Sequence, residues 1–171
     1  KLSQWTNCDH HVVKWSGSHY HLIMKGNLLL EEIQVNEVLS IANTIAPIDS
    51  NEFHPVLEDM VFATYPANEL VFERGDLQPG EMFILEGIVR TYLSDSEGRE
   101  VTLNIHVGPC TFTPSIGREM DSISRVDCAS LSETRVARFS TDNLIKCMMD
   151  NSAVQKWGDA VLRNELVLRA D

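Results

Sequence analysis

The sequence predicts a mainly β domain with flanking helices: an antiparallel β-barrel or jelly roll followed by a long C-terminal helix. Between residues 61 and 140, segments rich in β-branched and aromatic residues alternate with turn signals. Before and after this stretch, apolar residues recur at helical spacing. The length of 171 residues, with 43% hydrophobic and 23% charged residues, is typical of one folded domain.

The β-rich stretch divides into short strands because turn residues interrupt it at regular intervals. The turn signals include Pro79-Gly80, Gly108-Pro109 and the run from Asp95 to Gly98. The predicted strands cover residues 61–65, 70–73, 82–93, 101–107 and 127–139. We therefore divide the chain into residues 1–26, N-terminal helices over 27–60, a β-barrel over 61–140 and C-terminal helices over 141–171.

The helical segments are predicted from apolar stripes and capping residues. One stripe marks a helix over 28–45, which Pro47 ends, and Asp49-Ser50 is placed to cap the next helix. After the barrel, Thr141 or Asp142 can cap a short helix to Met149, and Asn151-Ser152 can cap the last one. The stripe of the first helix consists of Leu28, Val35, Val38, Leu39, Ala42 and Ile45.

The last helix carries apolar residues at the spacing of a coiled coil. Its seam has steps of 3, 4, 3 and 4 residues, with one polar residue that sets register. We expect this seam to pair two chains into a homodimer, and the alternative is that it packs on its own barrel. The seam residues, our candidates for the dimer interface, are Val154, Trp157, Val161, Asn164 and Leu168.

Composition excludes several classes of protein. With 14 Lys and Arg against 25 Asp and Glu, the formal charge is −11, so this chain is not expected to bind DNA by itself. No apolar stretch approaches the roughly 20 residues of a membrane span, and no membrane partner is expected. The four cysteines form no CxxC pair, which favours reduced thiols and a cytoplasmic location.

Residues 1–26 differ from the rest, with four of the six histidines and two of the three tryptophans. We interpret them as a leader or an added, non-native segment. The alternative is a metal site, although structural zinc sites have tighter paired spacings than these residues show, so no metal is predicted. The ligands of such a site would be Cys8, His10, His11, His19 and His21.

The runs over residues 65–76 and 82–90 carry a family pattern: an apolar pair, Gly75-Asp76, an aromatic-Ile pair and Gly87-Ile88-Val89-Arg90. Residues 95–100 resemble the hairpin that follows it. From about residue 60 to 171 the chain resembles the cyclic-nucleotide-binding sensor domain of the cyclic-AMP receptor protein and fumarate–nitrate regulator (Crp/Fnr) family of bacterial transcription regulators. The resemblance implies a jelly roll that binds an effector, a dimerisation helix and a DNA-binding domain located beyond this chain.

The ligand chemistry of that family depends on a Gly-Glu pair and an arginine in a phosphate cassette. In this chain Phe112 and Thr113 stand at the Gly and Glu positions, Arg125 is a counterpart of the arginine, and Asp127 would repel a phosphate. No cofactor is predicted with certainty, and the expected ligand is a small anionic or nucleotide-like effector. The effector-binding candidates are Thr111, Phe112, Thr113, Ser115, Arg118 and Arg125.

The residues leave three hypotheses of function. The leading one is the effector-binding domain of a transcription regulator, homodimeric and bound to DNA only through a further C-terminal domain. The second is a single-domain dimeric interaction module that binds neither ligand nor DNA. The third, an enzyme of cupin type, needs clustered His and Glu ligands, and His106 and His54 are too few. We therefore expect no catalytic residues.

Overall fold

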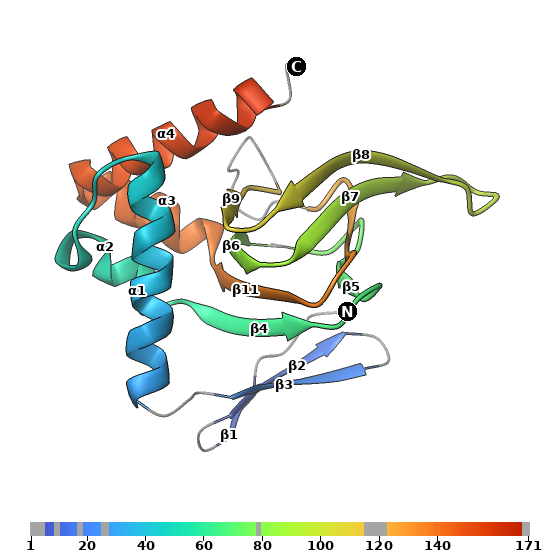
Figure 1. Cartoon of the computed structure of the whole chain (residues 1–171), viewed down its shortest axis with the longest axis horizontal. Coiled ribbons are helices and arrows are strands. Elements are labelled where there is room, and N and C mark those ends of the chain that lie inside the picture. The colour runs from blue at the N-terminus through green and yellow to red at the C-terminus, as the bar shows by residue number, and fades with distance from the viewer. Residues whose placement is uncertain are drawn as a thin grey trace.

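The computed structural model describes residues 6–8, 11–16, 19–24, 28–77, 80–114 and 123–168, with side chains described from residue 33. Helices gather on one side of two β-sheets, and the β7–β8 hairpin extends on the other (Figure 1). The helices are α1 (Leu28–Ile45), α2 (Ser50–Leu57), α3 (Thr141–Asp150) and α4 (Ser152–Leu168). The strands after α2 are β4 (Val61–Tyr65), β5 (Leu70–Phe72), β6 (Glu81–Glu86), β7 (Ile88–Ser94), β8 (Glu100–Val107), β9 (Cys110–Phe112), β10 (Asp127–Ser130) and β11 (Thr134–Phe139).

These strands form two four-stranded antiparallel sheets. One has the order β5-β10-β7-β8 and the other β4-β11-β6-β9. The mainly β class with flanking helices and a C-terminal helix is confirmed, but strands β4 to β11 form two separate sheets and not one closed barrel. Side chains from both sheets join in one buried cluster, which therefore lies between them: Tyr65, Val71, Phe72, Met82, Ile84, Val89, Phe112, Cys128 and Val136.

Strand β6 is covered on both faces, which explains why its residues from Glu81 to Leu85 are all buried. Side chains alternate along a strand. Met82 and Ile84 therefore face the other sheet, whereas Phe83 and Leu85 face the helices. A strand buried on both faces is an almost continuous apolar run, and periodicity alone does not distinguish it from a short buried helix.

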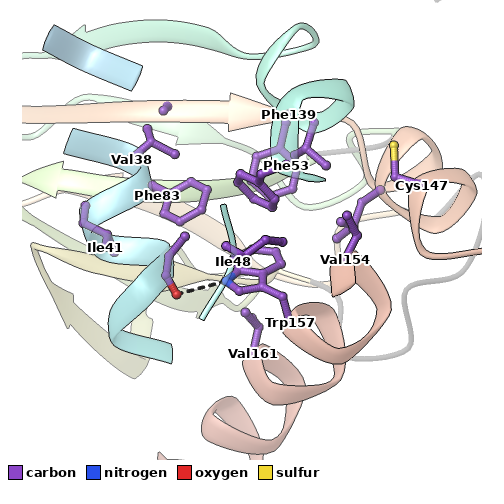
Figure 2. Packing of buried hydrophobic residues seen from close by; sticks show 14 of the residues in the cluster. Val38, Ile41, Ile48, Phe53, Phe83, Phe139, Cys147, Val154, Trp157 and Val161 are labelled. Carbon is purple, nitrogen blue, oxygen red and sulfur yellow. Dashed lines mark hydrogen bonds between the residues drawn. The ribbon is translucent and has the colours of Figure 1, made fainter. Parts of the chain in front are cut away.

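The second core lies between the helices and the sheet that contains β6. Trp157 of α4 is 1% exposed and packs against Phe53 of α2 and Phe83 of β6, with ring centroids 4.8 and 5.8 Å away. Figure 2 shows these aromatic rings and the hydrogen bond from the Trp157 indole to α1. The seam residues Val154 and Val161 belong to the same core and are 0% and 1% exposed.

The predicted helix caps are largely confirmed. Asp49 caps α2 through a capping box with Glu52, and its Oδ1 accepts the backbone N–H of Asn51 at 2.8 Å and of Glu52 at 2.9 Å. Asn151 caps α4, because its Oδ1 accepts the Ala153 N–H at 2.8 Å. The cap of α3 is Ser140 and not Thr141 or Asp142, since the Ser140 hydroxyl accepts the Asn143 N–H at 3.2 Å.

Three strand predictions need correction. The run over 82–93 is two strands that belong to different sheets and meet at Gly87, which has φ +98°. The run over 127–139 is also two strands, β10 and β11, separated by residues 131–133. The short strand β9, which pairs with β6, was not predicted as a strand.

The N-terminal segment also forms strands, which the sequence analysis did not predict. Strands β1 (Thr6–Cys8), β2 (His11–Ser16) and β3 (His19–Met24) make a separate antiparallel sheet. Strands β2 and β3 pair in register from His11↔Met24 to Ser16↔His19. The side chains of the alternative metal site lie outside those the structure describes. Over the described residues, no helix is long and apolar enough to cross a membrane.

Candidate functional site

The structure brings three of the predicted effector-binding residues together at β9. Thr111 is half-buried, whereas Phe112 and Thr113 are each 1% exposed. Arg125 lies near the other end of the segment between β9 and β10 and is exposed. Ser115 and Arg118, also predicted to bind effector, lie outside the described residues.

The Phe112 ring lies between the two sheets. It stacks on Phe72 of β5, with centroids 6.1 Å apart and planes 12° from parallel. The ring of His106 on β8 also contacts it, with its centroid 4.4 Å away. Phe112, which the sequence analysis placed at the glycine position of the family cassette, thus has its ring in the core between the sheets.

Thr113 joins two buried glutamates. Its backbone N–H donates to Oε1 of Glu165 in α4, and its hydroxyl donates to Oε2 of Glu81 in β6, each at 3.4 Å. Glu81 is 2% exposed and Glu165 is 1% exposed. Buried carboxyl groups are stable only when they are hydrogen-bonded. Thr113 is therefore held by protein groups on both its backbone and its side chain.

Sequence reasoning missed both glutamates. Glu81 begins β6 one residue before the predicted strand, and Glu165 follows Asn164, the predicted seam residue. The buried positions of α4 include Val154, Val161 and Glu165, which are 7 and 4 residues apart. A straight helix has 3.6 residues per turn, so its buried face drifts away from a 3.5-residue seam. The drift exposes Asn164 and buries Glu165.

For three residues the predicted dimer seam is wrong. Val154, Trp157 and Val161 are buried within their own chain, so they cannot form the contact with a second chain. The alternative, that the stripe packs on its own domain, describes them correctly. Asn164 is exposed and remains available, and the side chain of Leu168 lies outside those described.

The cysteines of this region are not activated. Burial raises the pKa of Cys128 to about 12, although Arg138 lowers it in part. Burial, and then the charge of Glu165, raises the pKa of Cys110 to about 11. Because the thiolate is the reactive form, both thiols are less reactive than an ordinary cysteine.

Asp127 and Arg125 lie where the chain enters β10. The Asp127 Oδ1 accepts the backbone N–H of Arg74 at 2.9 Å, which ties β10 to the turn after β5. Beside them, the Ser124 hydroxyl donates to the Val126 carbonyl at 2.7 Å. The backbone here is fixed by local bonds, and the Arg125 side chain extends from it to the surface. Within the described residues, no three His, Cys, Asp or Glu side chains are grouped to hold a metal ion.

The fold matches that of known proteins. Residues 62–151 match the family model "Cyclic nucleotide-binding domain". The sensor domain of the transcriptional regulator DNR from Pseudomonas aeruginosa is 19% identical, with TM-score 0.67 over 84% of this chain and 95% of that one. A cyclic nucleotide-binding domain from Methylobacillus flagellatus is 17% identical, with TM-score 0.66 over 81% of this chain and 79% of that one.

A longer regulator also has this fold. The c-di-GMP responsive global regulator CLP of Xanthomonas campestris is 18% identical, with TM-score 0.60 over 71% of this chain, and the match spans 59% of that regulator. At these identities the structural likeness shows the fold alone. No curated protein sequence matches the chain. The family model covers more than half of the residues, and the chain therefore belongs to the cyclic nucleotide-binding domain family, with the fold of Crp/Fnr-type sensor domains.

Proposed function

We propose that this chain is the effector-sensing domain of a Crp/Fnr-like transcription regulator, and that its effector is not held by the usual cyclic-nucleotide cassette. The family match and the regulators that share the fold support the sensing function. The proposed protein is a homodimer that binds DNA through a further C-terminal domain. The effector biases the packing of α4, and it can do so only if it binds two arrangements of the domain with different affinity.

The observation that carries this proposal is the pair Phe112 and Thr113. The Phe112 ring is 1% exposed and occupies the sheet interior at the position of the cassette glycine. Thr113 cannot act as the carboxylate that accepts a ribose hydroxyl, and its own hydroxyl is bonded to Glu81. The nearby carboxyl groups of Glu81 and Glu165 also disfavour a phosphate at this place. These contacts support the proposal that the effector is held in another way than by the usual cassette.

The effector class that we propose is a small anion or a nucleotide-like molecule that contacts Arg125. An exposed guanidinium offers a planar set of donors that suits carboxylate and phosphate oxygens. Thr111, Ser115 and Arg118 stay candidates for the same ligand, and no catalytic role is assigned to any of them. The effector then binds to residues of the chain between β9 and β10.

A thermal-shift titration of the chain tests this proposal. The ligands are cyclic AMP, cyclic GMP, c-di-GMP and inorganic phosphate, each against the parent chain, Arg125→Ala and the control Arg163→Ala on α4. A ligand at 100 times its Kd stabilises the fold by about 2.7 kcal/mol, which is a measurable shift in Tm. We expect a shift with c-di-GMP or phosphate that Arg125→Ala abolishes and Arg163→Ala retains. A shift with cyclic AMP that Arg125→Ala abolishes would contradict the proposed loss of the usual cassette.

A second candidate function is an interaction module without a ligand. It is favoured by two exposed apolar surfaces, since large apolar patches commonly mark protein contacts. Leu166 and Val167 of α4 are 54% and 63% exposed. On β8 the exposed residues are Val101, Leu103, Ile105 and Val107, each at least 52% exposed. Light scattering after gel filtration tests the dimer, and Leu166→Asp should lower the measured mass to that of one chain. If the chain is a module without a ligand, none of the four ligands of the thermal-shift titration changes its Tm.

A further inference from the structure

The last described turns of α4 are attached to the end of β9 through one carboxyl group. Nearer its start, α4 is held by Trp157 and Val161, which are buried in the core between the helices and the sheet that contains β6. Beyond Val161, from residue 162 to 167, Glu165 is the one buried position among these described side chains. Its Oε1 accepts the backbone N–H of Thr113 at 3.4 Å. The position of this end of α4 is thus tied to a residue outside the helices.

Thr113 is also attached to the sheet. Its hydroxyl donates to Oε2 of Glu81, which lies at the start of β6. Strand β6 is buried between the two cores and pairs with both β11 and β9, so Glu81 stands on a rigid element. Thr113 is the first residue after β9 and begins the segment that leads to Arg125. One residue therefore connects the sheet, the proposed effector segment and α4.

All three residues of this connection are at most 2% exposed. Water cannot easily replace a lost hydrogen bond at such a place, so a displaced partner leaves a buried polar group unsatisfied. The influence of Glu165 also extends to Cys110 on β9, since its charge contributes to the raised pKa of that thiol. Movement of Thr113 is consequently costly unless the end of α4 moves with it.

We propose that Glu165 is a positioning residue that couples the segment after β9 to the C-terminal turns of α4 through Thr113. An effector that displaces this segment shifts Thr113, and the hydrogen bond transmits the shift to the helix. The inference deepens the proposed sensing function, because it names the contact through which binding reaches α4. The coupling itself exists in the chain without an effector, so it can be measured separately.

Amide hydrogen exchange on the whole chain, followed by mass spectrometry of peptides, tests the coupling. Glu165→Ala removes the acceptor, and we expect the exchange rate to rise both in peptides of residues 160–168 and in peptides of residues 108–114. The rise should be at least about fivefold, which is the lower end of the usual range for coupled sites. Glu165→Gln keeps an acceptor oxygen at the same place and should restore most of the protection. The matched control is Glu37→Ala, which removes an ion pair between α1 and β11. It should leave both peptide groups unchanged.

A variant outside α4 makes the test independent of any loss of helix stability. Thr113→Val keeps the backbone N–H and deletes only the hydroxyl that bonds to Glu81. The proposal predicts faster exchange in residues 160–168, although nothing in α4 has changed. Exchange that rises only in the peptides that carry the substitution, for Glu165→Ala and for Thr113→Val, would overturn the coupling. That result would leave the effector titration above unaffected, so the two proposals fail separately.

Discussion

The indole N–H of Trp157 donates a 3.1 Å hydrogen bond to the backbone carbonyl of Ala42, which joins α4 to α1. The same carbonyl also accepts the N–H of Ala46 at 3.2 Å. A buried tryptophan needs a partner for its N–H, and here that partner lies on another helix. This relationship assigns Trp157 to the internal core and shows why an aromatic residue in a coiled-coil-like stripe need not face a second chain.

Trp157→Ala should therefore lower the stability of the fold and leave the oligomeric state unchanged. We expect a loss of about 3–5 kcal/mol in the free energy of unfolding, because the substitution opens a cavity among aromatic rings. Trp157→Phe keeps a ring and should lose about 1 kcal/mol. Urea unfolding gives both values. A Trp157→Ala protein that keeps its stability but changes its mass in light scattering would show that Trp157 contacts a partner.

The elements of the fold that could be predicted are those that local sequence patterns mark, such as helix caps, alternating apolar residues and turn residues. Asp49 with Glu52 forms the capping box that its spacing predicts, and the strands of residues 61–65 and 101–107 lie where alternation and turns place them. The three-residue strand β9 was missed because so short a segment has no measurable period.

The site depended on long-range contacts that local patterns do not report. Thr113 lies 32 residues from Glu81 and 52 from Glu165, so no window of sequence contains this cluster. A carboxyl side chain is also expected at the surface. The family resemblance located the segment through Phe112 and Thr113, but it could not supply their new partners. Only the drift of the buried face along α4 distinguishes Glu165 from Asn164.

Phe112→Ala tests how much the Phe112 ring contributes to the core between the sheets. The ring contacts Phe72 and His106 from two other strands, so its removal should cost about 3–5 kcal/mol of unfolding free energy. Phe112→Leu, which keeps much of the volume, should cost less than about 1.5 kcal/mol. Urea unfolding followed by circular dichroism measures both. A cost below about 1 kcal/mol for Phe112→Ala would mean that the ring lies outside the core.

Gly87→Ala and Gly98→Ala form a matched pair: Gly87 lies between β6 and β7, which belong to different sheets, and Gly98 lies in the turn of the β7–β8 hairpin. Both glycines have positive φ, +98° and +77°. An added Cβ at Gly87 would lie 2.4 Å from the Glu133 carbonyl oxygen, whereas at Gly98 it meets no described atom within 4 Å. Gly98→Ala should lose only the conformational strain of about 1–2 kcal/mol.

Gly87→Ala should lose more than about 3 kcal/mol, because backbone atoms must move as well. Thermal unfolding of the two variants beside the parent chain measures this difference. Equal losses would show that the turn after β6 opens easily to accept a side chain, and the tight approach of Gly87 to β11 would then not matter for stability.

The raised thiol pKa values predict slow alkylation. At about pH 8, Cys110, with its pKa of about 11, should react with iodoacetamide roughly 100-fold more slowly than a thiol of pKa 9.0, since the thiolate fraction falls in that proportion. Cys128, with a pKa of about 12, should react more slowly still. Peptide mass spectrometry assigns the labelled positions, and the same reaction in urea supplies the unfolded reference.

The raised pKa of Cys128 also sets the direction in which the stability of the fold changes with pH. The folded chain holds the Cys128 proton more tightly than the unfolded chain, so its contribution to stability is complete below about pH 9 and declines as the pH rises toward 12. From about pH 8.5 to 10 this one thiol should account for a loss of about 1 kcal/mol. Cys128→Ala lacks the titrating group, so its urea stability should decline less than that of the parent chain over this range. An equal decline in both proteins would mean that the Cys128 thiol titrates alike in the folded and unfolded states.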